Sequence, residues 1–115
     1  MDLINTTLRN NTVTDEGSVA YISESHDMNL IESSLVELNN VSKKGIITLK
    51  SANLNFWNST LQNNEALPYP GLFLISSNVS IAGSTIKDQT GTSAGIGFVG
   101  IESTLVLEHT VVENV

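Results

Sequence analysis

A short motif recurs along the chain at nearly constant spacing, and this period limits the possible folds more than any other feature. The clearest copy is Asn-Leu-Asn-Phe-Trp-Asn-Ser-Thr-Leu-Gln-Asn-Asn at residues 53–64. Each copy has an apolar residue, small hydroxyl residues, a second apolar residue and a polar corner. The hydroxyl anchors of the five copies are 27, 26, 25 and 25 residues apart, at Thr7, Ser34, Thr60, Thr85 and Thr110. Such a period is typical of proteins built from stacked repeats.

The segments between the anchors predict short strands joined by tight corners. Apolar residues alternate over short distances, β-branched residues are frequent, and no segment has a helical pattern. A glycine recurs once per repeat, at Gly17, Gly45, Gly71 and Gly95, where we expect the chain to turn with a positive φ. A repeat of this size cannot bury its own apolar face, so successive repeats are expected to stack on one another.

Stacking predicts which side chains point inward, because equivalent residues of successive turns should lie ~4.8 Å apart in a parallel ladder. Two predicted inward columns are apolar in every copy: Leu3, Leu30, Phe56, Ile81 and Val106, and Leu8, Leu35, Leu61, Ile86 and Val111. A third predicted column contains Met1, Met28, Leu54 and Val79, with Thr104 as its one polar member. The sequence therefore predicts an all-β solenoid of about four to five rungs, with 25–27 residues per rung.

The chain resembles the right-handed parallel β-helix family, meaning the pectin-lyase-like superfamily and its adhesin and surface-protein branch. The resemblance rests on the form apolar-x-Asn-x-Thr-Leu-x-Asn-Asn, clearest at residues 56–64 and 3–11, and it covers essentially the whole chain. It implies a right-handed parallel β-helix, a fold shared by enzymes, adhesins and structural fibres. Corner asparagines stack amide on amide in that family. The expected corner column here reads Asn5, Glu32, Asn58, Gly83 and Glu108, so we expect an interrupted ladder.

The charge balance argues against nucleic acid and membrane partners. Five Lys+Arg against twelve Asp+Glu give a net charge of −7, whereas phosphate binding requires clustered cations. No apolar run approaches the ~20 residues of a membrane span, and no basic-then-apolar signal segment opens this sequence. The absence of cysteine excludes disulfides and thiol chemistry. We therefore expect neither nucleic acid binding nor membrane insertion.

Side chains suited to catalysis or metal binding are not grouped in the sequence. Enzymes of the resembled family need clustered aspartates, or calcium-binding carboxylates with a basic residue. Asp88 and Glu113 are expected one rung apart in one column, but a single pair supplies too few of the ~6–8 oxygens that calcium takes. His26 and His109 show no Ser–His–Asp or two-His metal spacing and are expected at the surface. We predict no catalytic residue, no metal site and no cofactor.

Five apolar residues directly follow the first inward column, and strand alternation points them outward. This expected apolar stripe consists of Ile4, Ile31, Trp57, Ala82 and Leu107. A stripe of that length is more than scattered surface hydrophobes. Three explanations are open: it docks a neighbouring chain, the loop at residues 66–70 covers it, or it lines a carbohydrate groove, as the resemblance implies.

The N-glycosylation acceptor pattern occurs five times, at Asn5, Asn10, Asn40, Asn58 and Asn78. It points to a secreted glycoprotein, or else to the frequent use of Asn, Ser and Thr in turns and ladders. Because the corner at Asn58 is expected to turn inward, Asn58 should be the position without a glycan.

These expectations describe residues 1–115 as a single β-helix segment of a longer extracellular or cell-surface solenoid. The expected function is that of a non-catalytic structural or adhesive element, which meets further β-helix rungs or other copies of itself end to end or laterally. The alternative is a fragment of a polysaccharide lyase- or hydrolase-like β-helix that binds carbohydrate. A pure assembly protein that forms fibres is the third possibility. A carboxylate cluster on the outward sheet would favour the enzyme, and the mass in solution tests for assembly.

Overall fold

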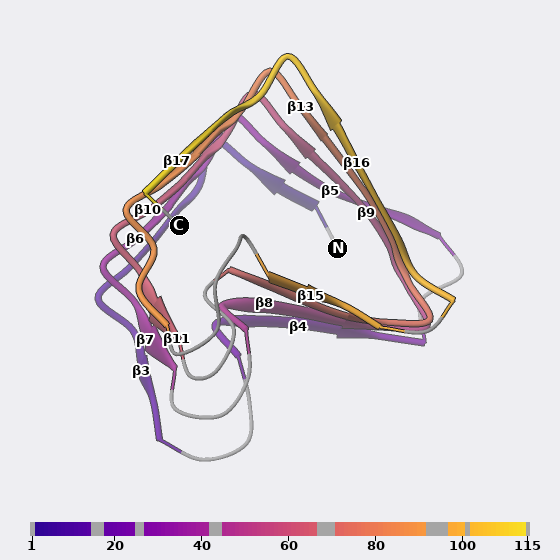
Figure 1. The fold of residues 1–115 in the computed structure, drawn as a ribbon, viewed down its shortest axis with the longest axis horizontal. Helices are drawn as coiled ribbons and strands as arrows, with labels where there is room; N and C mark the ends of the chain where they lie inside the picture. The colour runs from indigo at the N-terminus through magenta and orange to yellow at the C-terminus, as the bar shows by residue number, and fades with distance from the viewer. Residues whose placement is uncertain are drawn as a thin grey trace.

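The chain forms a solenoid of short parallel strands. The computed structural model describes residues 2–14, 18–24, 27–41, 45–66, 71–91, 97–100 and 102–114. All strand pairs in these segments are parallel, and they stack in about four turns around a roughly triangular cross-section (Figure 1). In Figure 1 the chain runs counterclockwise as it advances towards the viewer, which is the right-handed sense. The predicted all-β parallel solenoid is confirmed.

Two five-stranded sheets form the right and upper left walls in Figure 1. Sheet A contains β1 (Asp2–Ile4), β5 (Met28–Glu32), β9 (Asn53–Trp57), β13 (Asn78–Ala82) and β16 (Thr104–Glu108). Sheet B contains β2 (Thr7–Arg9), β6 (Leu35–Glu37), β10 (Thr60–Gln62), β14 (Thr85–Lys87) and β17 (Val111–Glu113). In both sheets each strand pairs with its equivalents one turn away, so the repeat of the sequence becomes the ladder of the fold.

Two smaller sheets complete each turn at the lower left and along the base of Figure 1. Sheet C contains β3 (Thr12–Val13), β7 (Asn40–Val41) and β11 (Glu65–Ala66), and a single bridge joins Glu65 to Thr90. Sheet D contains β4 (Ala20–Ser23), β8 (Ile47–Lys50), β12 (Leu72–Ile75) and β15 (Gly97–Val99).

Aliphatic side chains from all four sheets fill the space between the walls. The inward column of sheet A is Leu3, Ile31, Phe56, Ile81 and Leu107, and that of sheet B is Leu8, Val36, Leu61, Ile86 and Val112. Within these columns Phe56 is the largest fully buried side chain. Removing one such side chain from water contributes roughly 1.5–3 kcal/mol, so these columns are the main source of the solenoid's stability.

The observed register corrects the predicted columns by one residue in the second and fifth turns. Ile31 aligns with Leu3 and Phe56, and it is fully buried where Leu30 was expected. Leu107 aligns with Ile81 in place of Val106. In sheet B, Val36 and Val112 likewise replace Leu35 and Val111. Both predicted positions are followed by a second apolar residue, and a slip of one residue exchanges the two faces of a strand.

The third predicted column needs the same correction. Leu54 and Val79 are in register and buried, as expected. Met28 is exposed, and the neighbouring Asn29 occupies the buried position, where its Nδ2 donates to the Asn53 carbonyl oxygen at 2.9 Å. Leu105, and not Thr104, continues the column at the last turn. Met1 lies outside the described residues.

The recurring glycines serve different purposes. Gly71 has φ of 108°, as a positive-φ corner requires. The expectation of a positive φ is wrong for Gly45, where the chains approach closely: a Cβ would lie 2.9 Å from the Gly71 carbonyl oxygen and 2.9 Å from the Phe73 nitrogen. Gly17 and Gly95 lie outside the described residues.

Replacing Gly45 by alanine should therefore destabilise the protein, because the new methyl group meets backbone atoms that cannot rotate away. We expect a loss of about 1–3 kcal/mol in the free energy of unfolding, the usual cost of overpacking, measured by urea denaturation. The exposed Gly91, changed to alanine, is the matched control. Equal midpoints for both variants would show that the close approach at Gly45 is unimportant.

Candidate interaction surface

Hydroxyl groups join the turns at the corner between sheets A and B. The corner residues Asn5, Ser33, Asn58, Gly83 and His109 all have positive φ. Each is followed by Thr6, Ser34, Ser59, Ser84 or Thr110. The Ser59 hydroxyl donates to the Trp57 carbonyl oxygen at 2.7 Å and accepts from the Ser34 backbone N–H at 3.0 Å. Ser33 and His109, and not Glu32 and Glu108, are thus the corner residues.

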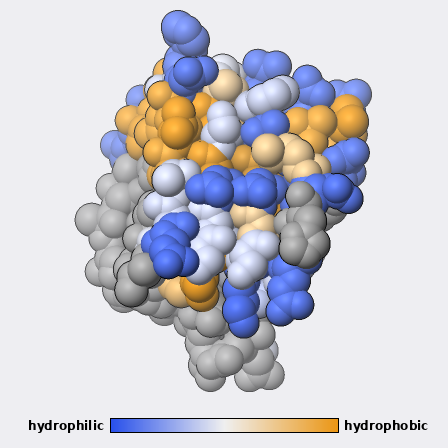
Figure 2. All heavy atoms as spheres, turned by 90° about the vertical axis from the view of Figure 1, so that its right-hand side faces the viewer, coloured by the Kyte–Doolittle hydropathy of each residue, from blue (hydrophilic) through white to orange (hydrophobic). Residues whose placement is uncertain are grey.

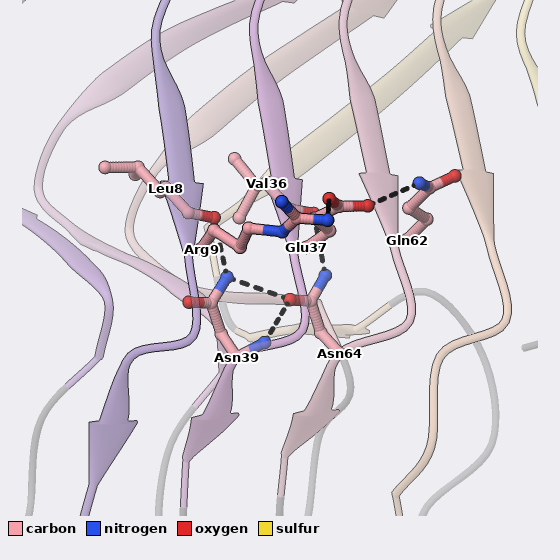
Figure 3. A network of polar contacts seen from close by, with 7 residues as sticks. All are labelled: Leu8, Arg9, Val36, Glu37, Asn39, Gln62 and Asn64. Atoms are coloured by element: carbon pink, nitrogen blue, oxygen red, sulfur yellow. Dashed lines mark hydrogen bonds and ion pairs between the residues drawn. The ribbon is translucent and has the colours of Figure 1, made fainter.

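An intact amide ladder lies at the next corner, between sheets B and C (Figure 3). The Asn39 Nδ2 donates to Asn64 Oδ1 at 3.0 Å and to the Leu8 carbonyl oxygen at 3.0 Å. Asn64 repeats the arrangement, because its Nδ2 donates to the Val36 carbonyl oxygen at 3.0 Å and to Gln89 Oε1 at 3.2 Å. The expectation of an interrupted ladder was wrong because it was drawn for the first corner. The Asn-Asn pairs at 10–11 and 63–64 are the sequence signal that marks the second.

Charged and amide side chains form a column on the outer face of sheet B, in the order Arg9, Glu37, Gln62, Lys87 and Glu113. The Arg9 Nη2 lies 2.9 Å from Glu37 Oε1, and the Gln62 Nε2 donates to Glu37 Oε2 at 2.6 Å (Figure 3). The Glu37 side chain is only 8% exposed, and a buried carboxylate needs such partners. Sequence reasoning missed this column because its members differ in type from turn to turn.

The expected carboxylate pair does not form. Glu113 is in register with Lys87, and Asp88 occupies the corner that follows, where its Oδ1 accepts from Asn114 Nδ2 at 3.0 Å. Among the described residues, no group of three or more His, Cys, Asp or Glu side chains could hold a metal ion. His109 is exposed at its corner, as expected, and His26 lies outside the described residues. No helix in the described part of the chain is long and apolar enough to cross a membrane.

The expected apolar stripe is interrupted. The outward column that contains Ile4, Trp57 and Ala82 has Glu32 and Glu108 at its other two positions. Ile31 points inward and is fully buried, so it belongs to no outer surface. Figure 2, which faces sheet A, shows hydrophobic atoms gathered on the left and right with polar atoms between them. The apolar surface is therefore at the ends of the sheet.

One end of the solenoid has both apolar side chains and unpaired strands. We name β16 and β17 together the terminal edge, because they pair only with β13 and β14. Leu107 and Val112 continue the two inward columns but are 45% and 37% exposed, since no further strand covers them among the described residues. Val106 and Val111, facing outward on the same strands, are also exposed. Such an edge can pair with an added strand.

The five acceptor asparagines are all at the surface: Asn5, Asn10, Asn40, Asn58 and Asn78. The inward orientation expected for Asn58 is wrong, because its positive-φ corner directs the side chain to solvent. The Asn78 side chain is engaged by its neighbours: its Nδ2 donates to Asn53 Oδ1 at 2.9 Å, and its Oδ1 accepts from Thr104 Oγ1 at 2.6 Å. Solvent exposure therefore does not separate Asn58 from the other four acceptor positions.

The comparisons with known proteins add no relative. No protein-family model, no curated protein and no solved structure matches this chain. The chain is a parallel β-solenoid. Membership of the pectin-lyase-like superfamily or of its adhesin branch has no match in support, so the site must be interpreted from its own geometry.

Proposed function

We propose that this chain is a non-catalytic structural and interaction element that binds further β-structure through its terminal edge. The observation in support is the exposure of Leu107 and Val112 at the ends of two otherwise buried columns. Ile81, one turn earlier in the first column, is 1% exposed because β16 covers it. An added strand would cover Leu107 in the same way, and burying a leucine contributes roughly 1.5–3 kcal/mol.

The place of action that we propose is the cell surface or the extracellular space, in an adhesin-like protein. The support is the exposure of all five acceptor asparagines, since N-glycans need side chains that face solvent. In this proposal Asn58 is an acceptor like the others.

Changing Leu107 to lysine tests the function. A lysine on the apolar end of the column should raise the dissociation constant for association at least roughly tenfold, a loss of about 1.4 kcal/mol. The variant should keep its fold, because Leu107 is already 45% exposed. The measurement is light scattering across a dilution series, with circular dichroism to check folding.

The matched control is Val106→Lys, which places the same charge on the same strand but on the outer face of sheet A. A loss of association in this variant alone would indicate a lateral contact and overturn the proposal. A wild-type protein that stays monomeric at all concentrations would overturn it as well.

A further inference from the structure

We infer that the terminal edge binds the opposite end of a second copy of this chain, so that copies stack head to tail. The opposite end is formed by β1 and β2, which pair only with β5 and β6 and leave their other edges free. This inference rests on the proposed function and names its partner.

The apolar columns of the two ends match. Laying a second copy on the terminal edge in register places its Leu3 after Leu107 and its Leu8 after Val112, which extends both inward columns with residues that belong to them. Both pairs are 104 positions apart in the sequence, so one placement satisfies both columns. Leu3 and Leu8 are only partly buried in the single chain, and the contact would cover them together with Leu107 and Val112.

The charges on the outer face of sheet B decide the direction. In this placement Arg9 of the second copy lies one rung beyond Glu113, the same step that separates Arg9 from Glu37 within the chain, where the two side chains meet at 2.9 Å. The joined column reads Lys87, Glu113, Arg9 and Glu37, so basic and acidic groups alternate across the contact. Arg9 is 55% exposed in the single chain and has room for a second carboxylate.

The corner between sheets A and B also continues. The Thr110 hydroxyl donates to the Glu108 carbonyl oxygen at 2.9 Å, as Ser59 does to that of Trp57. The equivalent Thr6 hydroxyl donates to the Ile4 carbonyl oxygen at 3.1 Å and keeps lone pairs to accept a hydrogen bond. The Thr110 backbone N–H could donate to it, as the Thr6 N–H donates to Ser34 Oγ at 3.1 Å.

The reverse contact, between two terminal edges, lacks this match. The charged residues of β16 and β17 are Glu108 and Glu113, so two such edges would bring carboxylates together without a cation. Sheets C and D have fewer strands than sheets A and B, and the head-to-tail contact would therefore run along two walls of the solenoid. Because a head-to-tail contact leaves a free edge at each end, it produces open stacks and not closed dimers.

The experiment compares Glu113→Arg with Glu108→Arg by sedimentation velocity over a concentration series at low and high salt. Both variants make the same charge change on exposed residues of the terminal edge. Only Glu113 would face Arg9, whereas Glu108 would face Ile4 of the second copy. Because like charges across an interface are strongly unfavourable, we expect Glu113→Arg to raise the dissociation constant at least roughly tenfold and Glu108→Arg to raise it less than about threefold.

A mixing experiment tests the polarity directly. Glu113→Arg keeps an intact β1–β2 edge, so it should bind the terminal edge of a wild-type stack and stop its growth. A small fraction of the variant should therefore shorten wild-type stacks, whereas the same fraction of Glu108→Arg should not.

Association that is lost in Leu107→Lys but unchanged in Glu113→Arg would overturn head-to-tail stacking and leave the proposed function standing, with another occupant. Wild-type association that neither variant weakens would overturn both. Closed dimers of the wild type, with no larger species, would overturn the head-to-tail contact alone.

Discussion

Replacing Leu61 by aspartate is expected to abolish the cooperative fold. Leu61 is 1% exposed and stacks between Val36 and Ile86 in the inward column of sheet B. A carboxylate at this position would be buried among aliphatic side chains without a cation or a hydrogen-bond donor. The expected loss exceeds about 4 kcal/mol, a large part of the ~5–15 kcal/mol that usually stabilises a domain. Circular dichroism and urea denaturation measure it.

The neighbouring Thr60→Asp is the control for this variant. Thr60 is on the same strand but faces outward and is half-buried, so its carboxylate stays in contact with water, and we expect a change of less than about 1 kcal/mol. Similar unfolding midpoints for the two variants would show that the strand does not present Leu61 to the core.

Replacing Asn64 by leucine is expected to have the second largest effect, because the amide ladder loses its central member. The backbone N–H of Asn39 would lose its bond to Asn64 Oδ1 at 3.0 Å, and the Val36 carbonyl oxygen would lose its bond to Nδ2 at 3.0 Å. Each unsatisfied buried group costs about 1–3 kcal/mol, so we expect a total loss of about 3 kcal/mol or more. Urea denaturation gives the total, and faster hydrogen exchange at the Asn39 amide locates it.

The matched control is Asn63→Gly, one residue earlier in the same corner. Asn63 is exposed with φ of 51°, a conformation that glycine adopts readily, so the unfolding midpoint should change little. If both variants lost the same stability, the backbone of the corner, and not the ladder, would be responsible.

The sequence alone was sufficient for the fold class. The period of the motif, the short alternating strands and the lack of a helical pattern have one simple solution, because a unit of this size must bury its apolar face against its neighbours. The central turns were also predicted in register, since Phe56 and Ile81, and Leu61 and Ile86, are single apolar positions between polar neighbours or small side chains.

The second and fifth turns were not predicted in register because the local pattern there is ambiguous. Leu30–Ile31 and Val106–Leu107 each offer two adjacent apolar residues, and either residue can face inward. The choice depends on the length of the preceding loop. The structure shows 28 residues from Leu3 to Ile31 and 26 from Ile81 to Leu107, where the motif had indicated 27 and 25. The apolar stripe failed for the same reason, because Ile31 took its place in the core.

What the sequence by itself determined is the stacking of turns, since the motif states the period and the burial of aliphatic residues requires the stack. Only the tertiary structure decided which corner contains the amide ladder, which side chains surround Glu37 and where apolar surface stays exposed. These properties depend on residues about 25 positions apart that become neighbours one rung away. Leu107 and Ile81 have similar local sequence, yet one is exposed and the other buried, because burial is decided by the strand that lies next to them.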